Sequence, residues 1–200
     1  MVTIEDGLIK QWIELQENGE TEEAQKLYDD EIFDKVIDRF VDKYRDTIPG
    51  VEVLFSVLGY TPEPIILTHR ALKPKKHIIF TTQNVYGQAK YLYEKYIKSE
   101  PVVSVINEPS FGGIYEAMMR QLDINPARKY ALDITGGKKS MVASAAIFGR
   151  DFGFNILYVD YTDYREKIRR PVPGTEILDL VYSPERDLPE ANFNLQSKDV

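Results

Sequence analysis

Cysteine is absent from this sequence of 200 residues, and histidine occurs only as His69 and His77. The lack of thiols excludes disulfide bonds, thiolate zinc sites and cysteine nucleophiles, and it fits a reducing compartment. Long hydrophobic runs are also missing, because no apolar stretch approaches the ~20 residues that span a bilayer. The N-terminus lacks the basic and then apolar layout of a signal peptide. We therefore expect a cytoplasmic protein that does not bind a membrane.

An excess of positive charge is missing too, since the formal net charge is −7. Nonspecific binding to duplex nucleic acid needs a basic surface that faces the phosphates, so we expect no duplex nucleic acid as a partner. A small anionic ligand remains compatible, because local donors and helix N-termini can hold phosphates inside an acidic protein. The composition, 43% hydrophobic and 28% charged, is that of an ordinary globular domain.

The first part of the chain predicts an N-terminal helical hairpin. Leu8, Trp12 and Leu15 recur at helical spacing, Asn18-Gly19 interrupts the pattern, and apolar residues at helical spacing resume over 24–40. Pro49-Gly50 then marks a turn, after which the pattern changes to short apolar runs. We therefore assign 1–48 to an N-terminal helical extension.

The rest of the chain alternates between short apolar strands and helices of 10–15 residues. The expected strands are 51–57, 77–81, 102–106, 129–134, 155–160 and 176–181, and the expected helices are about 62–72, 86–96, 113–122 and 138–152. This alternation is typical of βαβ units with right-handed crossovers. The predicted fold is α/β, a Rossmann-like and mainly parallel sheet with helices on both faces. It covers 49–184 and precedes a polar C-terminal tail, 185–200.

Ligands of such sheets bind at the carboxyl ends of the strands where the strand order reverses, here between the first and fourth strands. The loop after the first strand runs from Ser56 to Pro64. Gly59 lets the backbone approach a ligand closely, Thr61 can cap the next helix, and Pro62 suits its first position. Taken alone, the same residues also fit an ordinary capped turn.

The loop after the fourth strand, 133–140, reads Asp-Ile-Thr-Gly-Gly-Lys-Lys-Ser. Gly136 and Gly137 expose backbone amides, a helix N-terminus follows, and two lysines add positive charge, so the loop predicts a phosphate site. The alternative is a flexible turn with solvated lysines. The loop does not match a P-loop, and the sequence has neither a G-x-G-x-x-G after the first strand nor a G-x-S-x-G elbow.

Three segments together resemble the CRISPR-associated Rossmann-fold (CARF) domains of type III CRISPR ancillary proteins. They are the Ser-x-x-Gly-x-Thr-Pro-Glu-Pro turn from Ser56, the Asp-x-Thr-Gly-Gly-Lys-Lys-Ser turn from Asp133, and the segment 170–176. The resemblance runs to about Pro184 and is strongest to the branch with a helical N-terminal extension. It implies a homodimer whose loops surround a two-fold axis and bind cyclic tetra- or hexaadenylate, a second messenger of antiviral defence.

The resemblance also implies roles for single residues. Gly136, Gly137 and Lys138 would hold phosphates, and Thr135 would bond a ribose or phosphate oxygen. The other wall would come from the first loop, and Gln83 would reach an adenine edge unless it belongs to a plain polar loop. The implied ligand-binding residues are Ser56, Gly59, Tyr60, Thr61, Gln83, Thr135, Gly136, Gly137 and Lys138.

Other polar residues carry less weight. Arg169 and Arg170 belong to a basic run that either faces phosphates or marks a solvated face. Asp160 and Asp163 lack a third ligand at a recognisable spacing, so we expect no metal site, and we expect no cofactor. His69 and His77 are expected to have packing or surface roles.

Some CARF domains cleave their ligand, so a metal-independent ring nuclease is the alternative to a pure sensor. Lys138, Thr135 and Ser56 would be its candidate catalytic residues, but no histidine near either loop offers a general base. A nucleotide-metabolite enzyme or a transcription-linked regulator using the same crevice is a third hypothesis.

CARF domains are often joined to a HEPN ribonuclease with an Arg-x-x-x-x-His signature. Pro64 and Leu72 stand five positions before the two histidines, so this chain lacks that signature. We expect a stand-alone sensor or the sensing part of a longer protein, with an effector domain or partner protein that this sequence does not contain.

Overall fold

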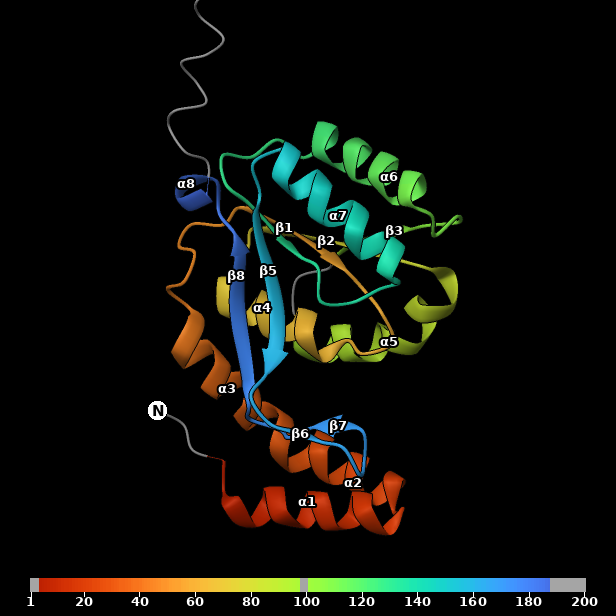
Figure 1. The fold of residues 1–200 in the computed structure, drawn as a ribbon, viewed down its shortest axis with the longest axis vertical. Helices are drawn as coiled ribbons and strands as arrows, with labels where there is room; N and C mark the ends of the chain where they lie inside the picture. Colours follow the sequence, from red (N-terminus) through yellow and green to blue (C-terminus); the bar gives the residue numbers. More distant parts are fainter. Residues whose placement is uncertain (1–3, 98–100, 188–200) are drawn as a thin grey trace, which may run out of the picture.

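The computed structural model describes residues 4–97 and 101–187, and its centre is a six-stranded sheet (Figure 1). The strand order is β3-β2-β1-β4-β5-β8. The strands are β1 (Val53–Val57), β2 (Lys76–Thr81), β3 (Val102–Val105), β4 (Tyr130–Asp133), β5 (Asn155–Tyr161) and β8 (Glu176–Tyr182). This arrangement confirms the predicted Rossmann-like α/β fold.

The first five strands of the sheet are parallel, as predicted from their apolar runs. All five residues of β1 are buried, and Phe55 pairs with Ile78 of β2 on one side and Leu132 of β4 on the other. Strands covered on both faces need continuous apolar sequence, which is why these segments show no alternation. The order reverses between β1 and β4, as the sequence predicted.

The last strand, β8, pairs antiparallel with β5, a direction that the sequence pattern left open. The segment between them contains only the small hairpin of β6 (Tyr164–Arg165) and β7 (Arg170–Pro171), which the sequence had not predicted. A parallel return normally requires a crossover helix. The chain therefore reverses direction at this edge.

Helices cover both faces of the sheet and enclose two apolar clusters (Figure 1). One face carries α4 (Glu63–Leu72) and α5 (Gln83–Tyr96), and the other carries α6 (Phe111–Ile124) and α7 (Lys139–Asp151). A short helix, α8 (Pro184–Asp187), follows β8. Most of the predicted polar tail, 188–200, lies outside the described residues. No helix among those described is long and apolar enough to cross a membrane.

The N-terminal segment forms more than a two-helix hairpin. Helix α1 (Asp6–Asn18) ends at Gly19, which has a φ of +82°, and α2 (Thr21–Leu27) continues through a π-helical turn (Tyr28–Ile32) into α3 (Phe33–Tyr44). The turn at Gly19 lies where the sequence predicted it, whereas the π-helical turn was not predicted.

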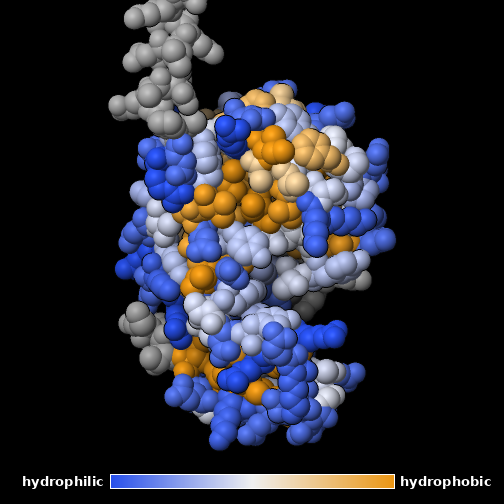
Figure 2. All heavy atoms as spheres, viewed as in Figure 1, coloured by the Kyte–Doolittle hydropathy of each residue, from blue (hydrophilic) through white to orange (hydrophobic). Residues whose placement is uncertain are grey.

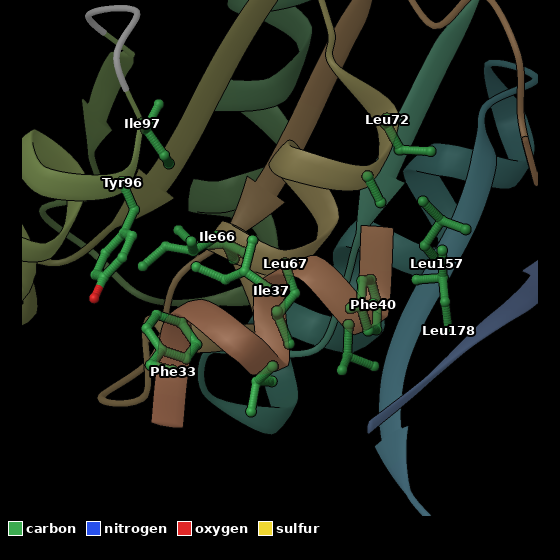
Figure 3. Packing of buried hydrophobic residues seen from close by; sticks show 14 of the residues in the cluster. Phe33, Ile37, Phe40, Ile66, Leu67, Leu72, Tyr96, Ile97, Leu157 and Leu178 are labelled. Atoms are coloured by element: carbon green, nitrogen blue, oxygen red, sulfur yellow. The ribbon is translucent and has the colours of Figure 1, made fainter. Parts of the chain in front are cut away.

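Helix α3 packs into the core of the sheet domain (Figure 3). Its buried residues Phe33, Ile37 and Phe40 belong to the same apolar cluster as Leu67 of α4 and Leu178 of β8. The surface of the N-terminal helices is mainly polar, while apolar side chains gather near α7 and the β5–β8 edge (Figure 2). Because one core joins the helices to the sheet, the domain boundary at 48/49 stays a prediction.

Candidate functional site

The loops after β1 and β4 touch through their backbones. A Cβ atom added at Gly59 would lie 2.7 Å from the backbone nitrogen of Gly137, and one added at Gly136 would lie 2.5 Å from the carbonyl oxygen of Val57. Both glycines are therefore required by the close approach of the two loops. The loops meet because β1 and β4 are neighbours at the point where the strand order reverses.

Gly137 must be glycine because of its backbone conformation as well as its close contacts. Its φ is +96°, in the range that L-residues rarely adopt, and an added Cβ would lie 2.5 Å from Cγ1 of Val57. Lys138 follows in an extended conformation as the N-cap of α7, with no side-chain capping bond. The first amides of α7 have no partner within the helix, and the helix dipole makes this end positive.

Thr135 fixes the start of the same loop. Its Oγ1 donates a hydrogen bond to Oδ1 of Asp133 at 2.6 Å, and its backbone amide donates to the same oxygen at 2.9 Å. The amide of Val159 on β5 donates to Oγ1 of Thr135 at 2.8 Å. Asp133 is fully buried, and burial raises the pKa of its carboxyl. The Thr135 side chain therefore holds the loop and has no proton left to donate to a ligand.

A cavity of about 830 Å³ lies beside the two loops. Its walls come from both loops, the first turn of α4, the N-terminal helices, the ends of β5 and β8, and the β6–β7 hairpin. The residues that line it include Trp12, Gln25, Tyr28, Gly59, Tyr60, Thr61, Glu63, Thr82, Thr135, Gly136, Gly137, Lys138, Tyr158, Tyr161, Arg169, Arg170 and Glu176. This volume falls within the ~300–1,000 Å³ of typical small-molecule sites.

Positive charge reaches the cavity from two directions. Lys138 lines it from the second loop, and Arg169 and Arg170 line it from the hairpin. The first turns of α4 and α7 also face it, through Pro64 and Met141, so two positive helix ends converge there. This arrangement suits a ligand that carries several phosphates.

Most of the residues implied by the sequence lie together at this cavity. The lining includes Gly59, Tyr60, Thr61, Thr135, Gly136, Gly137 and Lys138. Thr61 does not cap α4, because the helix begins two residues later, after Pro62 at the N-cap position. Arg165, the other arginine near the hairpin, is exposed and forms an ion pair with Asp163 at 3.6 Å.

Ser56 and Gln83 are not brought to the cavity. Ser56 is fully buried, and its Oγ lies 2.9 Å from Nε2 of His77. Gln83 is exposed at the start of α5, where Thr82 and Val85 line the cavity instead. Alternate residues of a strand face opposite sides of the sheet, and this alternation directs the Ser56 side chain into the core.

Several cavity residues were not identified from the sequence. Trp12 and Tyr28 fit the apolar face of an amphipathic helix, and only the folded chain places that face against the loops. The acid cluster, defined as Glu63 and Glu176 with Tyr28 and Tyr161, comes from four separate elements. No spacing in the sequence connects these four residues.

The pKa values of both carboxyl groups of the acid cluster are raised. Burial raises the pKa of Glu176 to about 7, and the nearby Glu63 carboxyl acts in the same direction. Burial also raises the pKa of Glu63, and Oε2 of Glu63 is enclosed without a hydrogen-bond partner among the described residues. Burial and neighbouring negative charge raise the pKa of Tyr161. A fraction of Glu176 is therefore uncharged at neutral pH.

The two histidines lie in the core and not at the cavity. Nδ1 of His69 lies 3.1 Å from Nδ1 of His77, which is bonded through its other nitrogen to Ser56. Burial lowers the pKa of His69 to about 4 and lowers that of His77 well below its usual value. Both rings are therefore neutral near pH 7. Their burial agrees with the packing role that the sequence predicted.

Comparison with known proteins gives one informative sequence match. No family model matches the chain. A CRISPR system endoribonuclease Csm6 from Thermus thermophilus is 35% identical over 92 residues, which cover 44% of this chain and 20% of that protein. The chain thus spans about a fifth of the length of this relative. The match confirms the predicted resemblance to the CARF proteins of CRISPR systems.

Three solved structures are similar to parts of the chain. Can2 from Sulfobacillus thermosulfidooxidans, in complex with cyclic tetra-adenylate, has a TM-score of 0.48 and 19% identity, covering 55% of this chain and 32% of that one. Protein VC1899 from Vibrio cholerae has a TM-score of 0.46 and 14% identity, with coverage of 55% and 30%. Enterococcus italicus Csm6, bound to cyclic hexa-2'-fluoro-hexa-dAMP, has a TM-score of 0.43 and 14% identity, with coverage of 57% and 34%.

Proposed function

We propose that this chain is a sensor domain of the CARF family that binds cyclic tetra- or hexaadenylate in type III CRISPR antiviral defence. The observation that carries the proposal is the contact between the two loops at the switch point, beside a cavity lined by Lys138, Arg169 and Arg170. The sequence similarity to a Csm6 endoribonuclease supports the same assignment.

The phosphates of the ligand would sit on the second loop. Gly136 and Gly137 carry no side chains that would keep a ligand from the backbone, and the start of α7 offers unpaired amides. Lys138 adds a full positive charge at the same place. Thr135 keeps this loop in position through its bonds to Asp133 and Val159.

The protein would act in the cytoplasm as a homodimer. The second copy would complete the ligand site. Tyr60 lines the cavity but is 78% exposed, and Phe111 at the start of α6 is 45% exposed. An exposed aromatic ring at a ligand cavity, as at Tyr60, fits burial against a second copy. A two-fold axis there would offer identical donor sets to a ligand with rotational symmetry. An effector domain or partner protein would then respond to ligand binding.

A thermal-shift comparison tests the proposed ligand class. Selective binding to the folded state raises the melting temperature, so cyclic tetra- or hexaadenylate should raise it more than linear oligoadenylate or NAD. Lys138→Ala should reduce the shift. Lys139→Ala is the matched control, because Lys139 is exposed and does not line the cavity. A shift with NAD alone would overturn the proposal.

A further inference from the structure

The acid cluster sits in the same cavity as the cationic residues, which is unexpected for a site that would hold only phosphates. Glu63 begins α4, Glu176 begins β8, and Tyr28 and Tyr161 come from the π-helical turn and the end of β5. A carboxylate next to a phosphate is repelled by it. The acids are therefore better suited to an uncharged part of a ligand than to its phosphates.

The carboxyl groups of the cluster have few partners in the protein: two backbone amides and Arg39 favour ionised Glu176, and its own amide and Arg170 favour ionised Glu63. Among residues 4–97 and 101–187, neither Glu63 nor Glu176 has an ion-pair partner within 4 Å. Oε2 of Glu63 is enclosed and lacks a hydrogen bond. Buried polar atoms are nearly always hydrogen-bonded, so the Glu63 carboxyl retains the capacity to accept a hydrogen bond beside the cavity.

A neutral carboxyl group matches one nucleobase edge in particular. It carries one O–H donor and one carbonyl acceptor. The Watson–Crick edge of adenine offers the N1 acceptor next to the N6 amino donor, so the two fit as a pair. Guanine presents the O6 acceptor beside the N1–H and N2 amino donors, which suit an ionised, acceptor-only carboxylate. The protonation state of the acid thus decides which purine it favours.

Resting on the proposed function, we propose that the acid cluster binds one adenine base of the cyclic oligoadenylate. The neutral carboxyl of Glu176 donates to N1 and accepts from the N6 amino group. The Glu63 carboxyl, which also lines the cavity, accepts the second N6 hydrogen, and the rings of Tyr28 and Tyr161 enclose the base. The cluster is then the part of the site that selects adenine, while the glycine loop holds the phosphates.

This assignment predicts a pH dependence of binding. Glu176 is neutral below its pKa of about 7 and ionises above it. The pKa of Glu176 is affected by Glu63, by Arg39, and by the backbone amides of Glu176 and Gly174. The negative charge of Glu176 in turn raises the pKa values of Tyr28 and Tyr161. Arg39 and the two amides favour ionisation, while burial and Glu63 oppose it. Affinity for the adenine ligand should fall as pH rises through 7.

Calorimetric titration of the full chain with cyclic tetraadenylate and cyclic tetraguanylate, at about pH 6 and pH 8.5, tests the inference. Wild type should bind the adenylate about tenfold more weakly at the higher pH. Glu176→Gln keeps a donor and an acceptor at every pH, so it should bind the adenylate without pH dependence. Glu176→Ala should bind weakly at both pH values. Asp179→Asn, an exposed acid on β8, is the matched control and should behave like wild type.

The outcomes separate this inference from the proposed function. Binding of the adenylate that is unchanged between the two pH values, or unaffected in Glu176→Ala, overturns the adenine assignment alone. Equal binding of the guanylate at pH 6 also overturns it. Failure of wild type to bind either cyclic tetra- or hexaadenylate at any pH overturns the proposed function and this inference with it.

Discussion

The backbone amide of Val159 on β5 donates a hydrogen bond to Oγ1 of Thr135, at 2.8 Å. That oxygen in turn donates to the buried Asp133 at 2.6 Å. The chain of bonds ties the glycine loop to a neighbouring strand, so the loop is ordered before any ligand arrives. Because the backbone amides of this loop are already held in place, they lose less entropy when a ligand binds.

Replacing Thr135 by valine should therefore loosen the loop. The variant loses both side-chain bonds and leaves the buried Asp133 carboxylate with a single donor from Thr135, which should cost about 1–3 kcal/mol of stability. Thr135→Ser keeps the hydroxyl and should lose less. Urea denaturation measures the difference. A Val variant as stable as wild type would show that the bonds contribute nothing.

Gly137→Ala should disrupt the site through its backbone. The residue has a φ of +96°, and the new Cβ would collide with the side chain of Val57, so we expect a loss of about 1–3 kcal/mol. Gly112→Ala is the control, because a Cβ there meets nothing within 4 Å and the φ is not positive. Denaturation midpoints of the two variants test this. Equal midpoints would refute the requirement for glycine at Gly137.

The histidine pair should resist protonation. Because burial lowers the pKa of His69 to about 4 and that of His77 below its usual value, the unfolded chain binds more protons than the folded one. Their contribution to stability is thus present above pH 6.5 and is lost as pH falls toward 4. The raised pKa of Glu176 acts oppositely, since its folded form gains stability as pH falls. NMR titration of the imidazole shifts separates the two effects, and a midpoint near 6.5 for either ring would contradict the structure.

Cyclic tetraadenylate should remain intact when incubated with the protein. Of the three candidate catalytic residues, Ser56 is buried away from the cavity and the hydroxyl proton of Thr135 is bonded to Asp133. Without these two hydroxyls, Lys138 has no partner among the candidate residues that would orient the ribose hydroxyl for attack. Chromatography of the reaction mixture tests this. Linear diadenylate that forms with wild type and is lost in Lys138→Ala would establish the ring-nuclease alternative.

The sequence predicted the switch-point loops because their position depends on local signals. Apolar runs located β1 and β4, and the parallel order that follows from βαβ units brought Gly59 and Gly136 to one place. The position of Gly136, Gly137 and Lys138 at the cavity follows for the same reason, and their binding of phosphates stays a prediction.

The rest of the cavity could not be predicted because it depends on packing between distant elements. Trp12 and Tyr28 have the spacing of core residues, and the orientation of their helices against the sheet is a tertiary property. Glu63 and Glu176 are far apart in the sequence and ordinary in composition. The side-chain direction of Ser56 required the exact strand register, which an apolar run does not specify.

Calorimetric titration with cyclic tetra- and hexaadenylate at neutral pH is the decisive test of whether the chain binds a cyclic oligoadenylate. We expect one of the two rings to bind, with one ring per two chains. Lys138→Ala should weaken binding by about tenfold or more, whereas Lys139→Ala should not. Absence of binding for both rings, or equal affinity in Lys138→Ala and wild type, would contradict this expectation.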